Sequence, residues 1–121
     1  MNIFRKIINF FTKRNNSQCS LSSNDIGIRY FRDNIEESSF EWKECRKIVT
    51  YKDDLVTTDL ICLEFELNNG KVFLAHEEQS GFQHLIGILR KIFPSIDENW
   101  YTEVMQPAFE TNFRILYERR A

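Results

Sequence analysis

A two-residue turn signal, Asn69-Gly70, limits what the middle of this chain can form. Both central residues of a type I′ β-turn need a positive φ, and asparagine followed by glycine adopts this conformation more readily than other pairs. We therefore predict a β-hairpin in which Asn68 pairs with Lys71 across a two-residue loop. The same register opposes Leu67 with Val72, Phe65 with Leu74, and Leu63 with His76.

This register predicts a hairpin with one apolar face and one more polar face. Glu64, Glu66 and Phe73 fall on the outer face. A shift of one residue would carry both glutamates into the core, so the pattern specifies the register strongly. The apolar face consists of Ile61, Leu63, Phe65, Leu67, Val72, Leu74 and His76.

Further strands are predicted before the hairpin. Apolar residues alternate at 26, 28 and 30 and again at 40 and 42, which is typical of extended chain. Residues 46–51 contain three consecutive β-branched residues and are predicted as a strand. The polar turn at 52–54 then leads into a strand at 56–67.

Two helices are predicted after the hairpin. Ser80 and Gln83 fit a capping box for a helix that begins at Phe82 and stops at Pro94. Gly87 falls off its apolar face and is expected to permit the close approach of another element. A second helical pattern covers residues 98–119, and Pro107 is expected to kink or break it.

The order of these elements predicts an α+β fold. It is an antiparallel sheet of about four to six strands, followed by two C-terminal helices packed on one face. At 121 residues the chain has room for one domain, which we expect at residues 25–121. Residues 15–24 are polar and are predicted to be a flexible linker.

The first fourteen residues differ in charge from the rest. They hold four of the 16 basic residues and none of the 18 acidic ones, so residues 15–121 carry a formal charge of −6. Their apolar residues recur at helical spacing, which predicts an N-terminal amphipathic helix. It could pack on the body or on a second subunit, lie on an anionic membrane surface, or remain disordered. Its expected membrane contacts are Phe4, Arg5, Lys6, Ile7, Phe11, Lys13 and Arg14.

Catalytic and cofactor signatures are absent from the sequence. No nucleophile elbow or glycine-rich phosphate loop occurs, and no cofactor is expected. His76 and His84, with Glu77 and Glu78 nearby, could bind a metal, but their spacing differs from that of a zinc motif. Three cysteines without paired spacing suggest a reducing compartment, so we expect the protein in the cytoplasm, either free or at the inner face of the membrane.

The acidic body favours a protein partner over nucleic acid. A negative surface repels phosphate, whereas it can accelerate association with a basic protein. The alternative is that these carboxylates only keep the protein in solution. The candidate partner-binding residues are Glu36, Glu37, Glu64, Glu66, Glu77 and Glu78.

One block of sequence consists of residues 40–42, 48–55 and 58–63, followed by Gly81-Phe82, Trp100-Tyr101 and Pro107-Ala108-Phe109. This block resembles a class of small bacterial proteins in which a strand-rich half precedes helices, and the resemblance covers about residues 26–119. In size, in acidity and in lacking catalytic residues, the chain is also similar to bacterial immunity proteins, which bind and neutralise a toxin; no site residue is implied.

Three functional hypotheses follow from the sequence. The first is a non-enzymatic protein-binding module, in its most concrete form an immunity-type inhibitor of a toxin. The second is a peripheral membrane adaptor anchored by residues 1–14. The third is a metal-dependent hydrolase whose site the sequence does not reveal.

Overall fold

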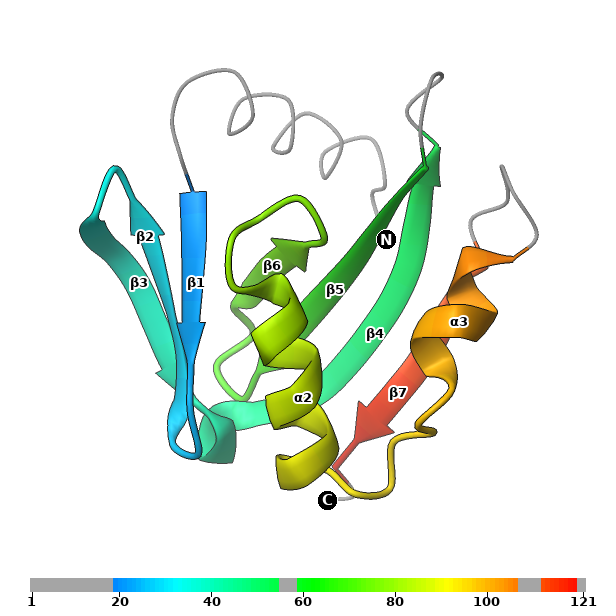
Figure 1. Cartoon of the computed structure of the whole chain (residues 1–121). Coiled ribbons are helices and arrows are strands. Elements are labelled where there is room, and N and C mark those ends of the chain that lie inside the picture. Colours follow the sequence, from blue (N-terminus) through cyan, green and yellow to red (C-terminus); the bar gives the residue numbers. More distant parts are fainter. Residues whose placement is uncertain (1–18, 55–58, 107–111, 120–121) are drawn as a thin grey trace.

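The computed structural model describes residues 19–54, 59–106 and 112–119 and shows a mainly β protein (Figure 1). Two antiparallel sheets, of three and four strands, make up most of the described chain. The predicted α+β fold, with one sheet followed by two helices, is therefore wrong. The sequence pattern identified most strands but contained nothing to show that they divide between two sheets.

The three-stranded sheet has the order β1-β2-β3. Its strands are β1 (Cys19–Ser23), β2 (Gly27–Arg32) and β3 (Ile35–Glu41). Strand β1 lies within the tract that we expected to be a linker. Asp33 and Asn34, with φ of 51° and 68°, form the two-residue turn between β2 and β3, where Arg32 pairs with Ile35. A type I′ turn therefore occurs in this sheet.

The four-stranded sheet has the order β6-β5-β4-β7. A 3₁₀ turn, η1 (Trp42–Glu44), connects the first sheet to it. Strand β7 follows both helices in the sequence and completes the sheet at the edge formed by β4. The strands are β4 (Cys45–Asp54), β5 (Asp59–Leu67), β6 (Val72–His76) and β7 (Arg114–Glu118).

The β5–β6 hairpin forms as predicted, but its register is shifted by one residue. The Leu67 N–H donates to the Lys71 carbonyl at 2.8 Å, so the loop holds three residues. Gly70 has a φ of 88°, whereas Asn69 is not among the positive-φ residues, which fits a type I turn ending in a left-handed glycine. The predicted pairs of Leu67, Phe65 and Leu63 are therefore wrong, and Phe65 instead opposes Phe73.

The shifted register has a clear packing cause. It points Phe73 inward, where its ring lies 5.6 Å from that of Tyr30 and 5.0 Å from that of Phe40. Val72 is left on the outer face and is exposed. Contacts with the other sheet, which hairpin rules do not include, thus decide the register.

Helix α2 (Phe82–Ile92) confirms the first predicted helix, with a different N-cap. Its N-cap is Gly81, and the capping box expected from Ser80 does not form. Gly81 has a φ of 94°, and a Cβ atom there would lie 2.0 Å from the Leu21 carbonyl oxygen. Gly87 has open space around it, so the expected close approach at that position is wrong.

Helix α3 (Trp100–Met105) is much shorter than the predicted helix at 98–119. Gln106, the residue before Pro107, is extended, with φ −119° and ψ 146°. This is the conformation that a following proline favours. Residues 114–118 form strand β7, whose pairing with β4 replaces the helical hydrogen bonds that we expected.

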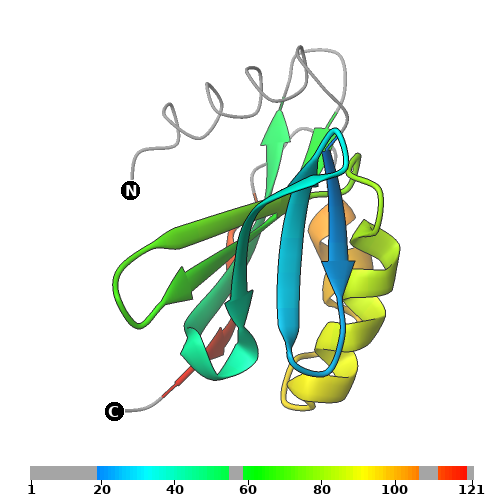
Figure 2. The same cartoon turned by 90° about the vertical axis from the view of Figure 1, so that its left-hand side faces the viewer.

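One main core joins the two sheets and the helices. Both helices lie on the same side of the four-stranded sheet (Figure 2). Phe82, Leu85 and Leu89 of α2 pack in this core with Trp100 and Val104 of α3. We call the side of the four-stranded sheet that these helices cover its inner face, and the opposite side its outer face.

Candidate protein-binding surface

The six candidate glutamates lie in three separate places. Glu36 and Glu37 belong to strand β3, where they face Arg29 at 3.9 Å and Arg32 at 2.9 Å. The Arg29–Glu36 pair is exposed and the Arg32–Glu37 pair is partly exposed, and surface ion pairs of this kind contribute little to stability.

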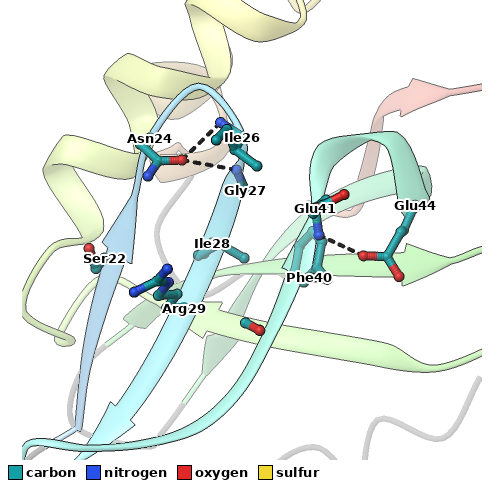
Figure 3. Close-up of a pocket in the computed structure, with 10 residues that line it drawn as sticks. Ser22, Asn24, Ile26, Gly27, Ile28, Arg29, Phe40, Glu41 and Glu44 are labelled. Carbon is teal, nitrogen blue, oxygen red and sulfur yellow. Dashed lines mark hydrogen bonds between the residues drawn. The ribbon is translucent and has the colours of Figure 1, made fainter.

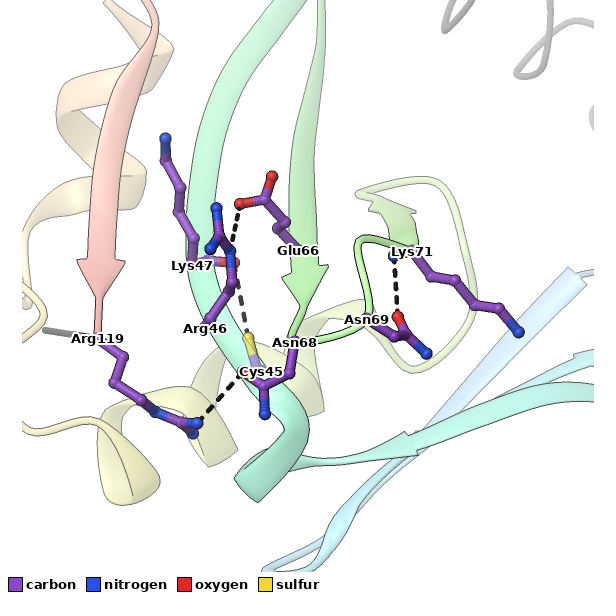
Figure 4. A network of polar contacts seen from close by, with 8 residues as sticks. All are labelled: Cys45, Arg46, Lys47, Glu66, Asn68, Asn69, Lys71 and Arg119. Atoms are coloured by element: carbon purple, nitrogen blue, oxygen red, sulfur yellow. Dashed lines mark hydrogen bonds and ion pairs between the residues drawn. The ribbon is translucent and has the colours of Figure 1, made fainter. Parts of the chain in front are cut away.

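The second place is strand β5, where Glu64 and Glu66 alternate with inward-facing apolar residues. Glu66 accepts a hydrogen bond from the Arg46 side chain at 2.8 Å (Figure 4). The same corner of the sheet carries Lys47, Lys71 and Arg119. Because Arg46 pairs with Glu66 and three further cations lie in the same region, this corner is not the acidic face that the sequence suggested.

The third place is the turn after β6, where Glu77 and Glu78 have different neighbours. One Glu77 carboxylate oxygen accepts the Ile61 backbone N–H at 2.9 Å, and the other accepts the Tyr101 hydroxyl at 2.8 Å. Glu77 therefore joins β5 to α3. Burial, together with this contact to Glu77, raises the pKa of Tyr101.

The outer surface of the three-stranded sheet contains a hollow of about 420 Å³ (Figure 3). Ser22, Arg29 and Ser39 face each other across the three strands and line this hollow. The two serines are small, and this leaves room on either side of the arginine. Ile26 and Glu44 also line the hollow, and Ile26 is 65% exposed.

Local hydrogen bonds shape the rim of this hollow. The Asn24 side chain accepts the backbone N–H groups of Ile26 and Gly27 at 2.8 and 3.1 Å. The Glu44 carboxylate accepts the Glu41 N–H at 2.8 Å. A Cβ atom at Gly27 would lie 2.1 Å from the Phe40 carbonyl oxygen, so glycine permits the close strand pairing beneath the rim.

Sequence reasoning did not identify this hollow. The one usable signal was the dipeptide Asp33-Asn34, which marks the β2–β3 turn and so aligns Arg29 with Ser39. The contribution of Ser22 could not be inferred, because its strand was taken for a linker. Glu36 and Glu37 were identified and lie on β3, the strand that also contributes Ser39 to the hollow.

The buried cysteines are poor nucleophiles. Burial raises the pKa of Cys45 to about 11. Burial and the Asp53 carboxylate, whose oxygen is 3.7 Å from the Cys62 sulfur, raise the pKa of Cys62 well above its usual value. Both thiols are therefore protonated at neutral pH, and a protonated thiol is unreactive.

The two histidines have separate surroundings. His76 is buried at the end of β6, and its Nδ1 accepts the Glu78 N–H at 3.3 Å. His84 is exposed on α2, with Nε2 3.1 Å from the Ser23 carbonyl oxygen. In the part of the chain that the structure describes, no three His, Cys, Asp or Glu side chains are grouped to hold a metal ion.

The expected membrane contacts from Phe4 to Arg14 lie outside the described residues. The membrane hypothesis therefore stays a prediction from the sequence. Among the helices that the structure describes, none is long and apolar enough to cross a bilayer.

Comparisons of this chain with protein-family models, curated proteins and solved structures found no match.

Proposed function

We propose that the protein is a non-enzymatic protein-binding module that uses the outer surface of its three-stranded sheet. The observation that carries this proposal is the hollow lined by Ser22, Arg29 and Ser39, with the exposed Ile26 beside it. Concave sites that combine an apolar side chain with a few polar groups are well suited to anchoring a ligand group. Here that group would be a side chain of the partner.

Strand β3, which contributes Ser39 to the hollow, extends this surface. Six of the seven residues of β3 are exposed, and three of the seven are glutamates. Glu36 and Glu37 would attract a basic partner and orient it over the hollow, an effect that acts mainly on the association rate. In its most concrete form, the protein is an immunity-type inhibitor that neutralises a basic toxin in the cytoplasm.

A comparison of two tryptophan variants tests this proposal. Ser39→Trp fills the hollow, whereas Ser95→Trp adds the same side chain at an exposed position beyond α2. Pull-down from the native cells should recover one stoichiometric protein with the wild type and with Ser95→Trp. Recovery should fall about tenfold or more with Ser39→Trp, because its indole occupies the space of the partner's anchor.

Two results would contradict the proposal. One is the absence of any stoichiometric partner with the wild-type protein. The other is equal recovery by both tryptophan variants, which would place the interface elsewhere. Circular dichroism of each variant checks that the fold is retained.

A further inference from the structure

Arg29 supplies positive charge to the hollow on the three-stranded sheet. Its side chain is 64% exposed. Among the described residues it has one ion pair, in which a Glu36 carboxylate oxygen lies 3.9 Å from Nε. A hydrogen bond between nitrogen and oxygen needs about 3.2 Å or less, so this contact is loose. The terminal nitrogens Nη1 and Nη2 can therefore bind a further anion.

The two carboxylates that line the hollow have closer donors than Arg29 has acceptors. A Glu41 carboxylate oxygen lies 3.2 Å from the Lys43 ammonium nitrogen. The Glu44 carboxylate accepts the Glu41 backbone N–H at 2.8 Å. Of the charged groups in the described hollow, the guanidinium of Arg29 is thus the one without a close counter-charge.

Two serine hydroxyls lie on either side of this guanidinium. Ser22 pairs with Arg29 across β1 and β2, and Arg29 pairs with Ser39 across β2 and β3. Residues directly opposite in an antiparallel pair point to the same face, with Cβ atoms about 4.5–5.5 Å apart. Both serines are exposed, and each hydroxyl can donate one hydrogen bond. The register of the sheet therefore places a row of donor groups across three strands.

We propose that this row binds the carboxylate of an aspartate or glutamate side chain on the protein partner. The planar guanidinium of an arginine presents two N–H groups that match the two oxygens of a carboxylate. Ser22 and Ser39 can donate to the oxygens from the two sides. The inference rests on the proposed function, because it names the partner group that enters the hollow.

The charges around Arg29 define the surroundings of that carboxylate on the partner. Glu36 is the residue beside Arg29, and Glu41 pairs with Gly27, two positions from Arg29 along β2. These glutamates and Glu44 repel a free anion, whereas they attract cations on either side of a bound carboxylate. The surface that fits is therefore one acidic side chain between basic ones, which a basic partner can present.

A peptide titration of the full chain tests the inference. The probe is the blocked tripeptide N-acetyl-Lys-Glu-Lys-amide, and its matched control has glutamine in place of the glutamate. Nuclear magnetic resonance follows the Nε–H signal of Arg29 and the amide signals of Ser22 and Ser39. We expect saturable shifts of these signals and a dissociation constant about fivefold or more lower for the glutamate peptide, because hydrogen bonds to a charged acceptor are the stronger ones.

Three variants assign this preference to the guanidinium. Arg29→Gln should remove it, and Arg29→Lys should reduce it by about threefold, since lysine keeps the charge but lacks the two-pronged geometry. Arg90→Gln is the matched control, because Arg90 is also exposed and pairs with Glu98 at 3.2 Å, on and beyond α2. It should leave the preference within about twofold of the wild type.

Two results would overturn the inference. One is an equal dissociation constant for the two peptides, or a preference that persists in Arg29→Gln. The other is tighter binding of inorganic phosphate than of the glutamate peptide, which would assign the row to phosphate.

The peptide titration and the pull-down with Ser39→Trp can fail independently. Equal peptide binding, together with loss of the partner in Ser39→Trp, would overturn the carboxylate site and leave the protein-binding surface in place. A clear preference for the glutamate peptide, with no partner lost in Ser39→Trp, would support the carboxylate site and contradict the proposed function.

Discussion

At the residue scale, two glycines of one region have opposite surroundings. Gly81 has a φ of 94° and no space for a side chain, whereas Gly87 lies inside α2 with open space around it. Gly81→Ala should lower the free energy of unfolding by about 2–4 kcal/mol, because strain and a clash with Leu21 add together. Gly87→Ala should raise it by about 1 kcal/mol, since alanine favours the helix.

Urea denaturation followed by circular dichroism measures both changes. The two variants should change the free energy of unfolding in opposite directions, and each serves as the control for the other. A stabilising Gly81→Ala would mean that the αL conformation at the start of α2 is wrong.

Cys45 makes the stability of the folded protein depend on pH in the alkaline range. Its thiol has a pKa of about 11 in the folded state, above the usual value of about 9, because burial disfavours the thiolate. A raised pKa means that the folded state holds the proton more tightly, so this stabilisation is complete below pH 9 and is lost as the pH rises towards 11. Cys62 acts in the same direction.

Replacement of Cys45 should reduce this pH dependence. In Cys45→Ala, the fall in unfolding free energy between pH 8.5 and 10.5 should be smaller than in the wild type by about 2 kcal/mol. Urea titrations at several pH values measure the slope. Ile48→Val is the control, because it removes buried volume without a titrating group and should keep the wild-type slope.

At the element scale, the two hairpin turns use asparagine differently. Asn34 has a φ of 68° between β2 and β3, whereas Asn69 precedes the left-handed Gly70 and is not itself in that region. Asn34→Gly should therefore stabilise the protein by about 0.5–1 kcal/mol, because glycine adopts a positive φ without strain. Asn69→Gly should destabilise it slightly, since there glycine only adds freedom to the unfolded chain.

Thermal denaturation of the two variants compares these turns directly. A stabilising Asn69→Gly would support the two-residue turn predicted from sequence and would contradict the three-residue loop. The prediction thus bears on the register of the whole β5–β6 hairpin.

The elements that could be predicted are those with strong local signals. The β-branched run at 48–50 and the alternation at 61–67 mark β4 and β5, and the apolar face of α2 is clear. Strand β7 was missed because five residues, Arg114–Glu118, fit a helical spacing equally well. Their structure depends on the free edge of β4, a partner more than sixty residues earlier.

The hollow was less predictable than the strands. Ser22, Arg29 and Ser39 meet only because three strands align in one register. Glu36 and Glu37 could be named from charge alone, but charge did not show that Glu77 has a structural role between Ile61 and Tyr101. Side-chain type identifies candidates, and pairing between distant strands decides which of them meet.

At the scale of the whole molecule, an aromatic cluster makes the two sheets depend on each other. The Phe40 ring of β3 lies 5.4 Å from that of Phe65 and 5.0 Å from that of Phe73, both in the other sheet. The Trp42 ring in turn contacts Phe65 and Phe93, at 6.0 and 5.8 Å. Because neither sheet has a separate core of its own in this region, we expect them to unfold together.

Phe40→Ala tests this dependence. It should lower the free energy of unfolding by about 3–5 kcal/mol, because it leaves a cavity between the sheets. Ile35→Ala, at a position of β3 that is 70% exposed, should change it by less than about 0.5 kcal/mol. Tryptophan fluorescence, which reports on η1 and α3, and far-ultraviolet circular dichroism, which reports on the strands, should give coincident urea transitions in all three proteins. Separate transitions in Phe40→Ala would mean that the four-stranded sheet remains folded without the three-stranded sheet, and that the hollow belongs to a unit of independent stability.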